Sequence, residues 1–384
     1  DDLIPDFPPR LWTKPRRERR MRSLLLLFAW PATLAWQAHA TPQSRRPLLP
    51  LRSTALLRPA GELQNQPPLL PLGVLMLVPV AWGTFGVAVK AVAKVGAPPP
   101  ELAFSVMQYV VASSALGLLS SVTVPPAASE KATRAATAAA GFELGSYLFF
   151  GALLQLFGLG MTTATRGAFI VQLTTIIVPL MDAAIKGTAP SRLLLGACVL
   201  AFGGVTAFVK SVPVAVMGTS MMGDGLIALA ALLYSLHVVR LSHHAPRIPP
   251  VALARAKELT RLCLGMFTLL GGIAFVAPQR RALVLFVRSF SAAPAEAFTA
   301  LVIVTWVGLV TTAFPTWGQS FGQRSIDAGT ASVIYTAQPL WSAVFGFALL
   351  GERLNGQSLA GAAAIFTAVA LVAWDRVRNT HRNG

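Results

Sequence analysis

Apolar runs long enough to cross a lipid bilayer follow one another through most of this sequence. They begin near Leu69, and only short polar segments separate them. Runs of about 20 apolar residues match a hydrocarbon core about 30 Å thick, so the pattern predicts an all-α membrane protein with about ten transmembrane helices. The expected helices are 72–93, 102–123, 141–161, 165–185, 192–210, 224–242, 257–277, 298–319, 329–350 and 357–374.

Composition excludes the soluble classes. Hydrophobic residues make up 54% of the 384 residues and charged residues only 12%, with a mean hydropathy of +0.61. A typical soluble domain has about 25% charged residues, so this chain has too little charge to cover a soluble surface. The net charge of +17 comes from basic residues near the start of the chain and beside apolar runs. They form no basic module with interleaved aromatic residues, so nucleic-acid binding is not expected.

Residues 1–68 are expected to be a targeting or disordered region, and residues 376–384 a basic tail. Residues 21–40 resemble a signal peptide, with the small-x-small sequence Ala38-His39-Ala40 at the expected cleavage position. Residues 41–61 contain Arg and Ser but no acidic residue, and resemble the second part of a plastid-targeting presequence. The alternative is a plain signal peptide followed by a linker. A plastid membrane is therefore expected, with an endomembrane or the plasma membrane as alternatives.

The chain repeats its polar pattern, which indicates two five-helix halves at 69–211 and 222–375. An offset of 160 residues aligns Pro179 with Pro339, and an offset of 152 aligns Trp82 with Tyr234. An odd number of spans in each half gives the halves opposite orientations in the membrane. Inverted repeats are typical of secondary transporters, in which the substrate binds near the midplane between the halves.

Five segments carry a recognisable pattern: Trp82–Lys90, Gly223-Asp224, Thr316–Gln319, Ser332–Trp341 and Leu350-Gly351-Glu352-Arg353-Leu354. These segments resemble those of the EamA-type members of the drug/metabolite transporter superfamily. The resemblance covers nearly all of residues 70–375 and implies export or exchange of a substrate by alternating access. One departure is Lys186-Gly187-Thr188, where many members have a second Gly-Glu-Arg, so a different cap is expected at that helix end.

Polar residues inside the membrane are expected to face the transport path, because an ionised side chain in hydrocarbon costs about 2.5–3.5 kcal/mol even on the more lenient scale. Hydrogen bonding across helices, helix-end pairing for Asp182 and snorkelling for Lys90 are the structural alternatives. Pro179 and Pro339 are candidate hinges, and Asp182 and Lys90 are candidate coupling residues. The residues expected to line the path are Trp82, Gln155, Gln172, Thr175, Tyr234, His237, Thr316, Gln319, Tyr335 and Gln338.

The leading function is a secondary transporter of a small organic metabolite, either a uniporter or a proton-coupled carrier. An organic-phosphate or nucleotide-sugar exchanger needs basic residues that face the cavity, and the candidates Lys90, Arg166 and Lys210 all lie near helix ends. A non-transporting scaffold or an intramembrane enzyme is less favoured, because no catalytic constellation is found. No enzyme activity, cofactor or metal is expected. The expected partners are a small-molecule substrate and the lipid bilayer, with a homodimer left open.

Overall fold

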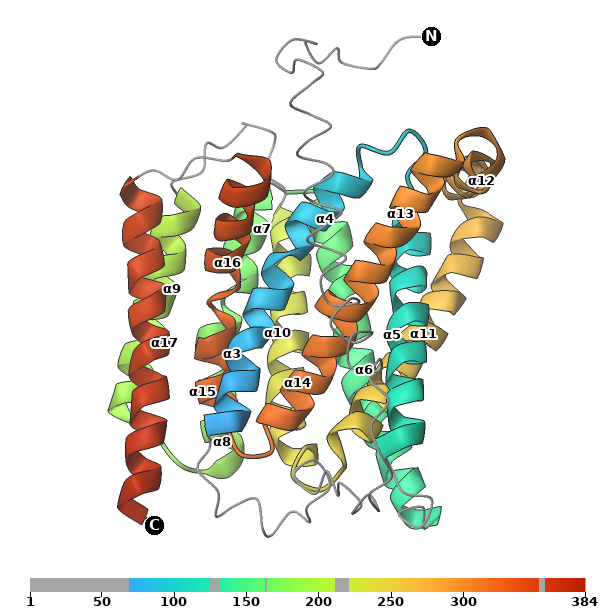
Figure 1. Cartoon of the computed structure of the whole chain (residues 1–384). Helices are drawn as coiled ribbons and strands as arrows, with labels where there is room; N and C mark the ends of the chain where they lie inside the picture. Colours follow the sequence, from blue (N-terminus) through green and yellow to red (C-terminus); the bar gives the residue numbers. More distant parts are fainter. Residues whose placement is uncertain (1–68, 124–130, 163, 211–220, 352–355, 384) are drawn as a thin grey trace, which may run out of the picture. The chain divides into compact units, whose positions relative to one another are not determined.

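The computed structural model describes residues 69–123, 131–162, 164–210, 221–351 and 356–383. Within these residues every regular element is helical (Figure 1). Nine of the helices are long and apolar enough to cross a membrane, and the shorter apolar helix Arg192–Ala207 makes ten in the described part of the chain. The predicted fold class is therefore confirmed. The predicted targeting region, 1–68, lies outside the described residues.

The first half of the chain contains five spans, two of which are interrupted. Span 1 is α3 (Leu69–Gly83) with α4 (Phe85–Val92), span 2 is α5 (Glu101–Thr123), span 3 is α6 (Lys131–Leu159), span 4 is α7 (Ala164–Val171) with α8 (Thr174–Lys186), and span 5 is α9 (Arg192–Lys210).

The second half also contains five spans and has one additional helix, α12 (Ala277–Ala292), between spans 7 and 8. Span 6 is α10 (Met221–His244) and span 7 is α11 (Pro250–Phe275). Span 8 is α13 (Pro294–Trp306), the π-helix η3 (Val307–Ala313) and α14 (Phe314–Gly322). Span 9 is α15 (Ala328–Tyr335), α16 (Gln338–Phe345) and the π-helix η4 (Gly346–Leu350), and span 10 is α17 (Gly356–Asn383).

The two halves run in opposite directions through the bundle. In Figure 1, span 1 rises from the end of the bundle where α17 finishes, whereas α10 descends towards that same end. Helix packing follows the same relation. Spans 1–5 correspond to spans 6–10. Span 3 packs on spans 6 and 7, and its counterpart, span 8, packs on spans 1 and 2. Spans 2, 4 and 5 pack on their counterparts, spans 7, 9 and 10. Exchanging the halves leaves this packing scheme unchanged, as expected of inverted repeats.

Spans 4 and 9 are interrupted at corresponding positions. In each span, the two residues between the half-helices donate backbone N–H hydrogen bonds to carbonyl oxygens three residues earlier, as in a 3₁₀ turn. These residues are Gln172-Leu173 in span 4 and Thr336-Ala337 in span 9. Both spans end at a left-handed glycine, Gly187 (φ 66°) and Gly351 (φ 73°). Glycine reaches this conformation without a Cβ clash and commonly ends helices. A left-handed glycine therefore ends both spans. Glu352 and Arg353 lie outside the described residues, so the expected difference in capping stays a prediction.

Glycines allow spans 3 and 8 to pack closely against their neighbours. A Cβ at Gly145 would lie 2.7 Å from the backbone oxygen of Lys257, and a Cβ at Gly322 would lie 2.2 Å from Cγ of Leu75. Span 3 uses Gly151 and Gly158 against α10 in the same way. Small residues permit such close helix contacts, which stabilise bundles in lipid through packing.

Three boundaries differ from the sequence-based expectation. Helix α11 begins at Pro250 rather than at residue 257, because proline at the first turn suits a helix start and the helix continues through its charged residues. Helix α6 begins at Lys131, within the expected linker. Helix α17 continues to Asn383, so residues 376–383 of the expected tail extend the last helix.

Candidate substrate cavity

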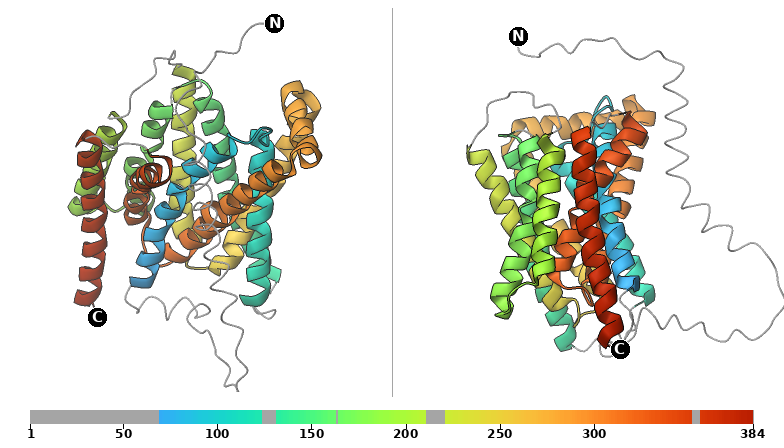
Figure 2. Two further views of the ribbon diagram at one scale, coloured as in Figure 1. Left: turned by 45° about the horizontal axis from the view of Figure 1, so that its top comes forward. Right: turned by 90° about the vertical axis from the view of Figure 1, so that its left-hand side faces the viewer.

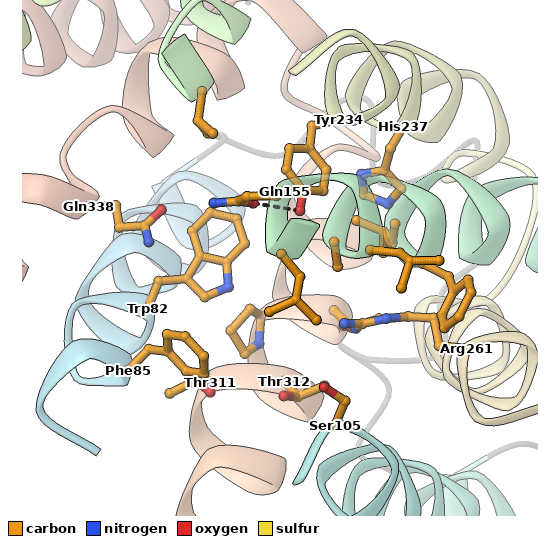
Figure 3. Close-up of a pocket in the computed structure, with 18 of the residues that line it drawn as sticks. Trp82, Phe85, Ser105, Gln155, Tyr234, His237, Arg261, Thr311, Thr312 and Gln338 are labelled. Atoms are coloured by element: carbon orange, nitrogen blue, oxygen red, sulfur yellow. Dashed lines mark hydrogen bonds between the residues drawn. The ribbon is translucent and has the colours of Figure 1, made fainter. Parts of the chain in front are cut away.

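A cavity of about 470 Å³ lies between the two halves of the bundle (Figure 3). Spans 1–4 and 6–9 contribute to its lining, whereas no lining residue comes from α9 or α17. These two helices pack together at one side of the bundle, as the right-hand view of Figure 2 shows. The volume falls within the range of small-molecule sites, about 300–1,000 Å³.

One wall of the cavity is aromatic and joins the two halves. The rings of Trp82, from α3, and Tyr335, from α15, meet edge to face with centroids 5.4 Å apart. Phe85, the first residue of α4, lies on the same side of the cavity (Figure 3). Such a wall offers apolar surface together with the polar edges of the indole and phenol groups.

A hydrogen bond between the two halves also lies at the cavity. The Tyr234 hydroxyl, on α10, donates to Oε1 of Gln155, on α6, at 2.8 Å (Figure 3). His237 lies one turn further along α10 and also lines the cavity, and among the described residues neither of its ring nitrogens has a hydrogen-bond partner. Buried polar atoms are usually paired, so His237 offers hydrogen-bonding capacity to a ligand.

Irregular helical segments supply further lining residues. Gln172 and Thr336 stand at the interruptions of spans 4 and 9, and Thr174 and Gln338 begin the half-helices that follow. The π-helix η3 contributes Thr311 and Thr312, whose hydroxyls both donate to the backbone oxygen of Val307. Interrupted and π-helical segments are tolerated inside membranes where they line cavities, and π-helical turns are frequent at functional sites.

Helix α11 introduces charge into the cavity. Lys257 and Glu258 are fully buried, and Arg261 lines the cavity. Glu258 accepts hydrogen bonds from Nη1 of Arg261 at 2.8 Å and from the hydroxyl of Thr316 at 2.7 Å. Nζ of Lys257 donates to the backbone oxygen of Thr316 at 3.3 Å. Sequence reasoning missed this group because it placed the start of the helix at residue 257, which put these charges at the membrane boundary. The available signal was three charges at one-, three- and four-residue spacings beside an apolar run.

Nine of the ten predicted path residues line the cavity: Trp82, Gln155, Gln172, Tyr234, His237, Thr316, Gln319, Tyr335 and Gln338. Thr175 is fully buried but does not line the cavity; its neighbour Thr174 does. The interruption at Gln172-Leu173 tightens the helix there, so the face that points inward differs from that of a regular helix.

The other predicted residues lie away from the cavity lining. Asp182 accepts a hydrogen bond from Lys186, one turn further along α8, at 2.7 Å. Lys90 is exposed on α4. Pro339 follows the interruption of span 9 directly, whereas Pro179 lies within α8, several residues after the interruption of span 4. The roles of these residues in coupling and hinge motion stay predictions.

A separate polar group joins α6 and α10 near the end of α10. Glu143 accepts hydrogen bonds from Nε and Nη2 of Arg240, the latter at 3.1 Å, and its carboxylate lies 2.9 Å from Nε2 of His244. Two bonds from one guanidinium fix the geometry of such a pair. Thr162 and Asp224 form a second bond between the ends of these spans at 2.8 Å, so spans 3 and 6 are joined by polar contacts at two levels.

Comparisons with known proteins agree with this architecture. Residues 221–374 match the model of the EamA-like transporter family. A solved structure titled "Crystal structure of protein" has a TM-score of 0.60 with this chain, covering 80% of this chain and 98% of its own at 17% sequence identity. At that identity the likeness concerns the fold alone. No curated protein matches the chain. Residues 221–374 of this multi-span membrane protein are therefore similar to the EamA-like transporter family.

Proposed function

We propose that the protein is an alternating-access secondary transporter that moves a small organic metabolite through the cavity between its halves. The observation that carries this proposal is that equivalent spans of both halves line one cavity, while α9 and α17 do not. A site shared by two inverted units can be exposed to either side of the membrane when one unit rocks against the other.

The local structure supports movement around this cavity. Spans 1, 4 and 9 are each interrupted near lining residues, at Thr84, Gln172 and Thr336. Short interruptions concentrate backbone rearrangement at a few positions, as hinges do. The Trp82–Tyr335 and Tyr234–Gln155 contacts both join one half to the other, so relative movement of the halves would alter them together with the substrate site.

The test is uptake into proteoliposomes, with a panel of labelled metabolites and with or without a pH gradient. We expect Tyr335→Ala and Gln155→Ala to abolish uptake while the protein remains correctly folded. A matched control is Thr305→Ala, because Thr305 is exposed on α13 and its hydroxyl donates to the backbone oxygen of Leu301, in the same helix, at 2.8 Å. Normal uptake by both cavity variants would refute the proposed path.

The alternative of an organic-phosphate or nucleotide-sugar exchanger is less well supported. Phosphate groups carry about two negative charges near neutral pH. Among the described residues that line the cavity, Arg261 is the single permanently charged side chain.

The predicted plastid location rests on residues 41–61, outside the described part of the chain, and is tested by fusing that segment to a fluorescent reporter.

A further inference from the structure

The charged residues of α11 lie within a membrane-spanning helix, where a charge without a partner is energetically unfavourable. Arg261 stands close to the middle of a helix that spans Pro250–Phe275 and that is long enough to cross the membrane. Lys257 and Glu258 occupy the preceding turn and have no exposed surface. Ionisable residues within membrane helices usually face a cavity or a partner and mark substrate or ion pathways.

The formal charges of this group do not cancel. The group holds two basic residues, Lys257 and Arg261, and one carboxylate, Glu258, which pairs with Arg261, so the formal charges leave one positive charge. Lys257 bonds a backbone oxygen, not a second carboxylate. No Asp or Glu is present among the described residues that line the cavity. A single negative charge brought by a ligand would therefore complete the balance, and pairing lowers the free energy of a buried charge.

The guanidinium of Arg261 is held in place and directed into the cavity. Its carbon atom lies 4.3 Å from the centre of the Tyr109 ring, and Nη1 is fixed by Glu258. Figure 3 shows Arg261 reaching into the cavity from the side opposite Trp82 and Gln338. Stacking on an aromatic face and one ion pair preorganise the group, which reduces the entropy lost when a ligand binds.

We propose that Arg261 binds a single anionic group of the substrate, of the carboxylate class, while the apolar body of the substrate lies against the Trp82–Tyr335 wall. The inference rests on the proposed function and names its substrate class: monoanionic organic acids, in preference to neutral or cationic analogues. A guanidinium pairs with a carboxylate in a planar, charge-assisted geometry. A phosphomonoester, with about two charges, would leave negative charge unbalanced at this site.

The experiment measures binding directly, by equilibrium dialysis of the purified full chain in detergent. The probes are matched trios of acid, amide and amine built on benzoic, 3-phenylpropanoic and octanoic skeletons. We expect at least one acid to bind about tenfold or more tightly than its amide and amine, because a hydrogen bond between charged groups is stronger than one to a neutral group. Binding of no acid, or equal binding within every trio, would overturn the assignment.

Variants separate Arg261 from general effects on the cavity. We expect Arg261→Gln to lower the affinity for the acid to that for its amide, while the amide affinity stays within about twofold, and Arg261→Lys to restore part of the preference. Since Arg261→Gln leaves Glu258 without its cation, the double variant Glu258→Gln/Arg261→Gln provides a neutral pair if the single variant does not fold. If Arg261→Gln, or the double variant where the single variant does not fold, still bound the acid more tightly than the amide, the role of Arg261 would be refuted.

A flux measurement distinguishes this inference from the proposed function. Selective acid binding without uptake into proteoliposomes would leave the anion site standing and refute transport. Equal uptake of acid, amide and amine, with uptake lost in Tyr335→Ala, would leave transport standing and refute the anion site.

Discussion

The second span of each half, α5 and α11, shows how the two halves differ. The helices pack on each other, and each contributes residues to the cavity. Helix α5 brings the neutral polar groups Gln108 and Tyr109 to the cavity lining, whereas α11 brings Arg261, with the buried Lys257 and Glu258 in the preceding turn. A nearly symmetric scaffold therefore holds an asymmetric site. The symmetry provides two similar units that can move against each other, and the asymmetry provides chemical selectivity.

The largest expected effect on stability comes from removing the Glu258 carboxylate of α11. Glu258→Ala leaves two buried cations without a counter-ion, and breaking a buried pair costs about 3–5 kcal/mol. We expect a large loss of monodisperse protein and a lower melting temperature in detergent. The comparison variant Gln108→Ala in α5 removes an amide oxygen that has no hydrogen-bond partner among the described residues, and is expected to change stability little. Equal stability of the two variants would show that the Glu258 carboxylate does not stabilise the buried cations Lys257 and Arg261.

A smaller effect is expected where the halves are alike. Gly322→Ala places a Cβ 2.2 Å from Cγ of Leu75, and Gly158→Ala places one 2.5 Å from Cγ1 of Ile227. Each should destabilise the protein by about 1–3 kcal/mol through overpacking, and to a similar extent. Thermal unfolding measures this, with Gly73→Ala as control because a Cβ there meets nothing within 4 Å. Destabilisation by one glycine variant alone would show that spans 3 and 8 are not equivalent in their packing.

The neutral contact between the halves should matter less. Tyr234→Phe removes the donor that satisfies Gln155, and the loss of about 1 kcal/mol should reduce uptake at low substrate concentration about fivefold. Tyr147→Phe is the matched control, because Tyr147 lies on α6 outside the cavity lining, with its hydroxyl 3.4 Å from Glu143. A stronger effect in the control would shift attention from the cavity to the Glu143 group.

The smallest effect is expected at Asp182. Its pair with Lys186 is a one-turn helix pair with a half-exposed lysine, and such pairs contribute about 0.3–0.5 kcal/mol. Asp182→Asn should leave both stability and the response of uptake to a pH gradient nearly unchanged. Loss of that response would restore Asp182 as a coupling residue despite its position away from the cavity.

Apolar run length was sufficient to predict most of the fold. Ten apolar segments follow from run length because each span must satisfy its backbone bonds within itself, whereas the two five-helix halves were inferred from the repeated polar pattern. The run 192–210 coincides with α9. By contrast, α11 extends through Lys257, Glu258 and Arg261. A hydropathy pattern places a helix boundary at such charges, but their hydrogen bonds within the group and to Thr316 stabilise them inside the helix bundle. That tertiary pairing is not visible along the chain.

The alignment of the repeats shows why the site was predicted only in part. An offset of 160 residues pairs Pro179 with Pro339, but the left-handed glycines Gly187 and Gly351 and the interruptions at Gln172 and Thr336 are separated by 164 residues. A shift of four residues is about one helical turn, so polar residues stay close to the same face and the wrong register still looks periodic. The position of Thr174 in place of Thr175 depends on the local tightening of the helix, which residue spacing does not reveal.

The pairing of α9 with α17 has an evolutionary consequence. Because these two final helices supply no lining residue in the described structure, substitutions on their lipid-facing sides can adapt the protein to bilayers of different thickness or composition without altering which solute is accepted. Selection for membrane environment and selection for cargo can then proceed on separate parts of one polypeptide.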